Sequence, residues 1–115
     1  MKDKKRIVQK ALVEQGINTS RLGFHYLTEA ILYQYSKGDE RFFITKDLYP
    51  YLADKFKSIS VGSVERAIRS AIVSSFDHYH VDHEMAYTFS NGKEYLTNKE
   101  FITFMLYRLE DQLDE

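Results

Sequence analysis

The chain has 115 residues, 43% of them hydrophobic, with no cysteine and a formal net charge of −1. This length supports one domain with a single core, so residues 1–115 are expected to form one unit. The lack of cysteine excludes disulfides, zinc–thiolate sites and cysteine nucleophiles. No apolar run approaches the ~18 residues of a membrane span, and the first ten residues lack the apolar core of a signal peptide. We therefore expect a cytoplasmic protein that does not enter the membrane.

The near-neutral net charge argues mildly against nucleic acid as a partner, because typical nucleic-acid-binding domains are basic overall. The charges are unevenly distributed, however. Residues 1–10 contain five basic side chains and one acidic one, whereas residues 108–115 contain one basic side chain and four acidic ones. A neutral total can therefore conceal a basic face.

Two helices are predicted in the first third of the chain, over residues 3–15 and 21–36. Gly16 is a plausible C-cap position for the first helix. The polar break that follows offers candidate N-caps for the second helix, namely Asn18, Thr19 and Ser20. Apolar residues recur at helical spacing in both segments: Ile7, Val8, Ala11 and Leu12 in the first, and Phe24, Leu27, Ala30, Ile31 and Tyr35 in the second.

Residues 45–76 predict two amphipathic helices joined by a short polar turn at residues 57–60. Thr45 is a candidate N-cap for the first of these helices, but Pro50 would remove a backbone hydrogen bond beyond the first turn, so the regular helix is expected to begin near Pro50. Ser60 can cap the second helix, at about residues 61–76. The residues expected to face inward are Leu48, Leu52, Ala53 and Phe56 in the first helix, and Val64, Ala67, Ile68, Ala71 and Ile72 in the second. Ala67 and Ala71 would allow close helix packing.

The second of these helices carries Arg66 and Arg69 on a face that the first helix cannot cover. This arrangement is typical of a helix-turn-helix, in which the second helix enters the major groove of DNA. A guanidinium group suits both guanine edges and phosphates. The competing interpretation is a solvated helix face, on which Glu65 and Arg69, four residues apart, form a local ion pair.

Residues 77–96 contain three histidines among acidic residues, His78, His80 and His83. Imidazole and carboxylate groups can bind a divalent metal, but this spacing matches no standard zinc site. A polar surface loop is favoured, and no metal or other cofactor is predicted. Asn91-Gly92, between YTFS and KEYL, predicts a short hairpin over residues 85–96, with an irregular loop as the alternative.

A capping box over Thr97 to Glu100 begins the last predicted helix. Its apolar side contains Phe101, Phe104, Met105, Arg108 and Leu109, widened by Ile102, Leu106 and Leu113. The acidic end of this helix is expected to fray. No phosphate-binding glycine loop, GxSxG or HExxH motif is present, so the chain is predicted not to be an enzyme.

Several segments resemble the C-terminal effector domain of the sporulation master regulator of endospore-forming bacteria, stage zero sporulation protein A. The motifs ITKDLYP and VERAIR are close to identical to those of that family. GINTSRLGFHYLTEAI at residues 16–31 resembles the family's second helix, and LTNKEFI at residues 96–102 resembles the start of its final helix. The resemblance covers about residues 7–109. It implies an all-α domain of about six helices whose helix-turn-helix reads a short DNA box near promoters, with two copies binding adjacent boxes in tandem.

The resemblance also implies roles for individual residues. In the family, base contacts come from the start of the recognition helix, where Glu65 and Arg66 match, and Arg69 is kept as well. Lys46 matches a lysine placed for contact with the DNA backbone. Ser63 stands where the family has an arginine, which removes one direct base contact.

Residues 77–94 differ from the family segment that contributes to contact with the sigma subunit of RNA polymerase. Activation of transcription is therefore an open question. No phosphoacceptor receiver domain is present, so the chain is either an excised effector domain or a small protein that acts without phosphorylation.

These observations predict a sequence-specific double-stranded DNA-binding protein that regulates transcription. Base contacts are expected from Glu65, Arg66 and Ser63. Arg66 would read a base edge, and Glu65 could accept from a cytosine amino group or orient Arg66. Contacts to the DNA backbone are expected from Arg69, Lys46 and Ser60. The alternative is a protein-binding module of a mobile element or phage that reuses this fold to engage a host protein through exposed tyrosines, for which Tyr79, Tyr87 and Tyr95 are candidates.

Overall fold

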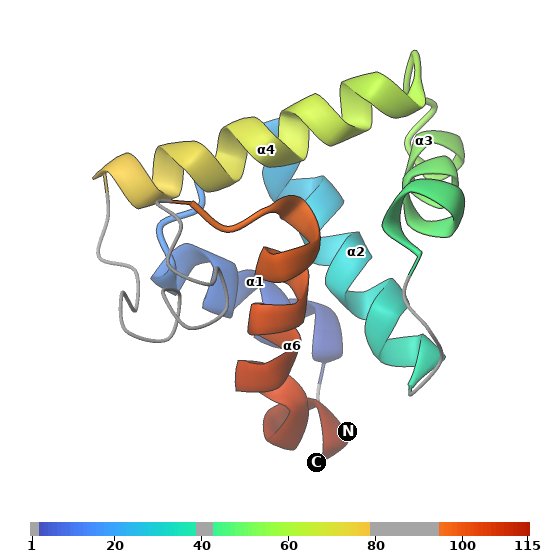
Figure 1. The fold of residues 1–115 in the computed structure, drawn as a ribbon. Helices are drawn as coiled ribbons and strands as arrows, with labels where there is room; N and C mark the ends of the chain where they lie inside the picture. Colours follow the sequence, from blue (N-terminus) through green and yellow to red (C-terminus); the bar gives the residue numbers. More distant parts are fainter. Residues whose placement is uncertain (1–2, 39–42, 79–94) are drawn as a thin grey trace.

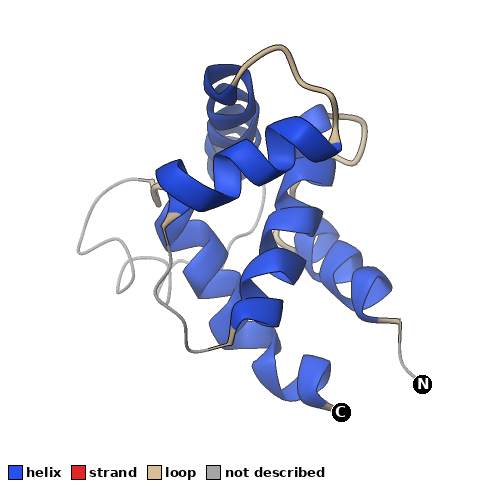
Figure 2. Cartoon of the chain, turned by 90° about the vertical axis from the view of Figure 1, so that its right-hand side faces the viewer, coloured by secondary structure: helices blue, strands red, loops and turns tan. Residues whose placement is uncertain are grey.

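The computed structural model describes residues 3–38, 43–78 and 95–115. Its elements are α1 (Lys4–Glu14), α2 (Leu22–Lys37), the π-helical turn η1 (Ile44–Leu48), α3 (Tyr49–Lys55), α4 (Val61–His78) and α6 (Asn98–Asp114). The described residues contain no strand, which confirms the all-α prediction (Figure 2). The predicted hairpin or loop lies outside the described residues, apart from Tyr95 and Leu96. No described helix is both long and apolar enough to cross a membrane.

Helix α2 is the centre of the fold, because it packs against α1, α3, α4 and α6 (Figure 1). Helix α4 crosses the top of that view, and both ends of the chain lie at the bottom. The residues predicted to face inward on α4 are buried or half-buried. The largest fully buried side chains are Leu12, Tyr26, Leu27, Ile31, Leu48, Leu52, Ile68, Ile72, Phe101, Ile102, Phe104 and Met105.

Gly23 allows α2 and α4 to approach each other closely. A Cβ atom placed on Gly23 would lie 2.5 Å from the carbonyl oxygen of Ala67 and 2.8 Å from the Cβ of Ala71. Real side-chain carbons do not approach backbone atoms so closely, so only glycine fits at this crossing. The prediction that the two alanines permit close packing is confirmed.

The C-cap residue of α1 is Gln15, one residue before the predicted position at Gly16, and α2 begins differently from the prediction. Gly16 follows the C-cap residue with a left-handed φ of +86°, and the Ile17 amide donates to the Leu12 carbonyl over 3.0 Å. Asn18 was a candidate cap, but its side chain accepts from the Ser20 amide and hydroxyl, at 2.9 and 2.7 Å. Arg21 is the N-cap of α2 and makes no side-chain cap bond. The cap prediction was wrong because the polar residues before α2 form hydrogen bonds with one another in a local turn and not with the first amides of the helix.

The approach to α3 is a wide turn and not a capped helix. The N-cap residue of η1 is Phe43, whose carbonyl accepts from the Asp47 and Leu48 amides at 3.1 and 3.2 Å. Thr45 lies within this turn, so the prediction that it is the N-cap was wrong. Pro50 is in the first turn of α3, where its missing N–H costs no helical hydrogen bond. The regular helix therefore begins next to Pro50, as predicted.

Both ends of α6 are fixed to the rest of the molecule. The Glu100 amide donates to Thr97 Oγ1 over 3.1 Å, and Glu100 Oε1 accepts from the Thr97 amide over 2.8 Å, which confirms the capping box. At the other end, the Tyr35 hydroxyl donates to the Leu113 carbonyl over 3.1 Å, and Leu113 is 1% exposed. The predicted fraying was wrong, because a buried leucine and a cross-helix hydrogen bond dock the acidic end.

Candidate nucleic-acid interface

The turn between α3 and α4 is held by backbone and side-chain hydrogen bonds. Lys57 has a left-handed φ of +53° and ends α3, where the Ser58 amide donates to the Ala53 carbonyl over 2.9 Å. A hydrogen bond also joins the Ser58 hydroxyl to that of Tyr26 in α2. The start of α4 is therefore positioned by the core and not by the turn alone.

Ser60 caps α4, as predicted. Its Oγ accepts from the Ser63 amide over 3.0 Å, and the Ser60 amide donates to Ser63 Oγ over 3.3 Å. The Ser63 hydroxyl in turn donates to the Ser60 carbonyl over 2.7 Å. The hydroxyl of Ser63 thus both donates and accepts within the cap.

Arg66 is exposed on the outward face of α4. Its Nη1 lies 3.2 Å from the place that a Cβ on Gly62 would occupy, so the guanidinium folds back over the first turn of the helix. Among the described residues, Arg66 has no hydrogen-bond or ion-pair partner. This cation is therefore presented at the N-terminal end of α4, and no acidic side chain in the described residues neutralises it.

Glu65 and Arg69 form an ion pair on the same helix. Arg69 Nη2 donates to Glu65 Oε1 over 3.0 Å, and the side chains of Arg69 and Glu65 are 64% and 39% exposed, respectively. An exposed pair of this kind contributes only about 0.3–0.5 kcal/mol. The local pairing that competed with DNA contact is thus present, but it is weak enough to be exchanged for a stronger anion.

Asn98, the first residue of α6, supports this helix from behind. Its amide nitrogen donates to the Tyr49 hydroxyl over 2.9 Å and to the Glu65 carbonyl over 3.2 Å, and the residue is 8% exposed. Burial raises the pKa of Tyr49, opposed by the hydrogen bond from Asn98, so this hydroxyl stays protonated at neutral pH. One side chain therefore joins α3, α4 and α6. In the sequence, the only sign of this role is a polar residue inside the capping box.

The predicted site residues fall into two groups. The first group lies at the N-terminal end of α4 and consists of the cap residue Ser60 and of Ser63, Glu65, Arg66 and Arg69 on the first three turns. The second is Lys46 on η1, where its Nζ is 5.7 Å from the centre of the Phe43 ring.

The predicted histidine cluster lies mostly outside the part of the chain that the structure describes. His78 is the last residue of α4, and His80 and His83 belong to the undescribed segment. Among the described residues no group of histidine and acidic side chains could hold a metal ion. Of the three tyrosines predicted to form a protein-binding surface, only Tyr95 is described, and it is half-buried with its hydroxyl donating to Asp77 over 2.8 Å.

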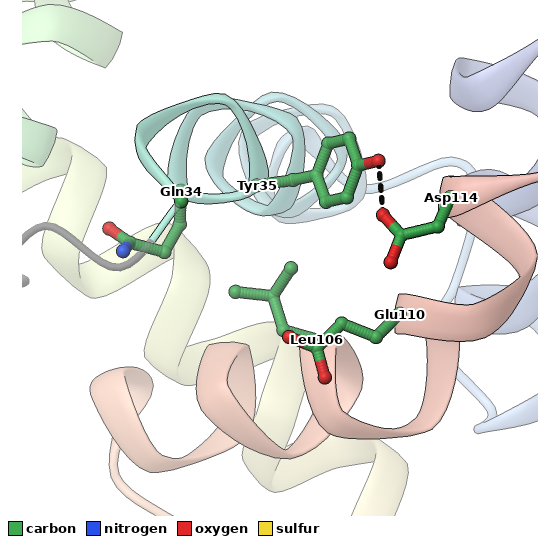
Figure 3. Close-up of a pocket in the computed structure, with 6 residues that line it drawn as sticks. Gln34, Tyr35, Leu106, Glu110 and Asp114 are labelled. Carbon is green, nitrogen blue, oxygen red and sulfur yellow. Dashed lines mark hydrogen bonds between the residues drawn. The ribbon is translucent and has the colours of Figure 1, made fainter.

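A cavity of about 310 Å³ lies between the end of α2 and α6, away from α4 (Figure 3). Tyr35 donates to Asp114 Oδ1 over 2.6 Å at its edge, and Glu110 also lines it. The hydrogen bond to Asp114 raises the pKa of Tyr35, which burial and nearby carboxylates raise further. Its two carboxylates make this cavity unsuited to a phosphate group.

A family model, that of the C-terminal domain of the sporulation initiation factor Spo0A, matches residues 8–109. The match covers the five α-helices in the described part of the chain, apart from the first residues of α1 and the last residues of α6. Proteins of this family use the domain as a DNA-binding effector.

Proposed function

Because the chain belongs to the family of Spo0A C-terminal domains, we propose that it binds specific DNA sequences and regulates transcription. In this proposal α4 enters the major groove of double-stranded DNA with its N-terminal turns facing the bases. The observation that carries the proposal is the exposed guanidinium of Arg66 on α4, which has no hydrogen-bond or ion-pair partner among the residues that the structure describes.

Arg66 is the proposed base-reading residue. Two parallel N–H groups of a guanidinium match the O6 and N7 acceptors of guanine, which is the commonest specific contact in the major groove. Glu65 would accept from a cytosine amino group or orient Arg66. Ser63, whose hydroxyl is engaged in the cap, would act mainly by setting how α4 begins.

Contacts to phosphate would supply most of the affinity. Arg69 can exchange Glu65 for a phosphate, and Lys46 and Ser60 would also contact the DNA backbone. Each neutralised phosphate releases condensed counterions, so binding should weaken steeply as salt rises. Tandem binding of two copies and contact with the sigma subunit of RNA polymerase extend the proposal, as the family resemblance implies.

The test is the variant Arg66→Ala, compared with Arg108→Ala, which removes an exposed arginine from α6 at a distance from the proposed reading face. Duplexes are selected from a random pool with the wild-type protein, and affinities are then measured for the selected site and its single-base variants. We expect Arg66→Ala to lose about 1–3 kcal/mol of discrimination at one base pair. Arg108→Ala should keep the wild-type preference.

The salt dependence gives a second readout. If Arg66 touches only a base edge, the slope of log affinity against log salt should stay at the wild-type value. If it also neutralises a phosphate, the slope should fall by about one. An Arg66→Ala protein with unchanged sequence preference and unchanged salt slope would contradict the proposed role of α4.

A further inference from the structure

The turn before α4 exposes one apolar side chain almost completely. Ile59 is 99% exposed, whereas the next most exposed large hydrophobic residue in the described part of the chain, Tyr107, is 62% exposed. Single exposed apolar residues are common and need no explanation by themselves. A role for Ile59 in binding a partner must therefore be argued from its position and its restricted conformation.

Ile59 is the one residue between two anchored neighbours. Ser58 is fixed by the hydrogen bond from its backbone amide to the Ala53 carbonyl and by the hydrogen bond between its hydroxyl and that of Tyr26. Ser60 is fixed by the cap of α4. The backbone on both sides is held, and a β-branched side chain has few rotamers. Ile59 is therefore already held facing the solvent, and it would lose little conformational entropy on binding a partner.

Few polar side-chain groups on the edge that carries Ile59 are free to bind a base. The hydroxyl of Ser63 donates to and accepts from Ser60, so it is used within the cap. Val61, the first residue of α4, is 37% exposed and adds a second apolar group. The leading edge of the helix therefore presents the apolar carbon of Ile59 and Val61 beside the Ser60 hydroxyl and the cationic Arg66.

Only one feature of a DNA base edge is complementary to apolar carbon. In the major groove thymine presents its C5 methyl group, and the other bases present hydrogen-bond donors and acceptors. We propose that Ile59, with Val61 beside it, contacts the C5 methyl group of a thymine near the base that Arg66 reads. The inference rests on the proposed function and assigns a second specificity-determining residue to the same surface.

The experiment removes the methyl group from the DNA and the side chain from the protein. The duplex is the best site selected from a random pool by the wild-type protein, with each thymine replaced in turn by deoxyuridine, which lacks only that methyl group. For the wild-type protein, we expect replacement at one or two positions to raise Kd about 4-fold, the value of one buried methyl group. For Ile59→Ala, the ratio of the two Kd values should fall to about one.

Two controls separate this contact from general effects. Ile59 contacts nothing in the fold, so Ile59→Ala should unfold at the wild-type temperature. Val13→Ala removes another exposed apolar side chain, 51% exposed on α1, and should keep the wild-type sensitivity to deoxyuridine.

The outcomes are distinguishable. Sensitivity to deoxyuridine that disappears in Ile59→Ala supports the proposal. Insensitivity of the wild-type protein at every thymine, or equal sensitivity in Ile59→Ala, overturns it and leaves DNA binding intact. Failure of the wild-type protein to enrich or bind any duplex at low salt overturns the proposed function and this inference with it.

Discussion

Asn98 is the residue that most directly connects the stability of the fold to the position of α4. Its buried amide donates to the Tyr49 hydroxyl and to the Glu65 carbonyl. In Asn98→Ala the Tyr49 hydroxyl and the Glu65 carbonyl each lose the hydrogen bond from the Asn98 amide, which should lower the free energy of unfolding by about 1–3 kcal/mol. Urea denaturation measures this change.

Thr103→Ala is the matched control for Asn98→Ala, because its hydroxyl is exposed and only donates to the backbone of its own helix over 2.9 Å. This variant should stay within about 0.5 kcal/mol of wild type. If Asn98→Ala were equally stable, the bridge between α3, α4 and α6 would contribute nothing, and another contact would have to position α4.

At the residue scale, the sequence predicts what a side chain does to its own helix better than what it does across the fold. The Ser60 cap and the exposure of Arg66 follow from spacing along one segment. The role of Asn98 does not, because its partners are 49 and 33 residues away in the chain. Which of Glu65, Arg66 and Ser63 touches a base stays a prediction.

At the scale of elements, long apolar stripes and a complete capping box were sufficient to predict the helices. Three predictions were wrong because a pattern in the local sequence was overridden by other contacts in the folded chain. Asn18 and Thr45 are residue types that favour an N-cap position. Asn18 instead accepts a hydrogen bond within a local turn, and Thr45 lies inside the π-helical turn η1. The acidic end of α6 resembles a solvated tail, and the burial of Leu113 overrides that pattern.

The crossing of α2 and α4 gives a prediction at this scale. In an exposed helix, Gly→Ala stabilises by about 1 kcal/mol through helix propensity. In Gly23→Ala the added methyl group would meet the backbone of Ala67, so the two helices must separate. We expect a net loss of about 1–3 kcal/mol in the free energy of unfolding and weaker DNA binding, because α4 shifts.

Gly62→Ala is the matched control for stability. The nearest atom to its new Cβ would be Arg66 Nη1 at 3.2 Å, the end of a flexible side chain, and Gly62 is only half-buried. This variant should equal or exceed the wild-type stability in the same urea titration. A Gly23→Ala protein as stable as Gly62→Ala would show that the helices separate without cost.

At the scale of the whole molecule, α6 places its acidic C-terminal end far from α4. The start of α6 contacts α4 through Asn98, whereas its last turns carry acidic side chains at the opposite end of the molecule (Figure 1). Glu110 and Asp111 are twelve and thirteen residues beyond Asn98, about 19 Å at the helical rise per residue. The net charge of −1 therefore does not describe the surface that would meet DNA.

This separation predicts how the acidic end affects binding as salt changes. At 0.15 M ionic strength the Debye length is about 8 Å, so Glu110→Gln combined with Asp111→Asn should change DNA affinity by less than about 2-fold. At 0.01 M the Debye length is about 30 Å, and removing two negative charges should tighten binding roughly 2- to 5-fold. Lys46→Gln, which removes a proposed backbone contact, should weaken binding at both ionic strengths.

Fluorescence anisotropy with one labelled duplex measures the affinities of the wild-type protein and of the two variants. An equal gain at both ionic strengths would place the end of α6 beside the DNA, contradicting the orientation in which the first turns of α4 face the bases.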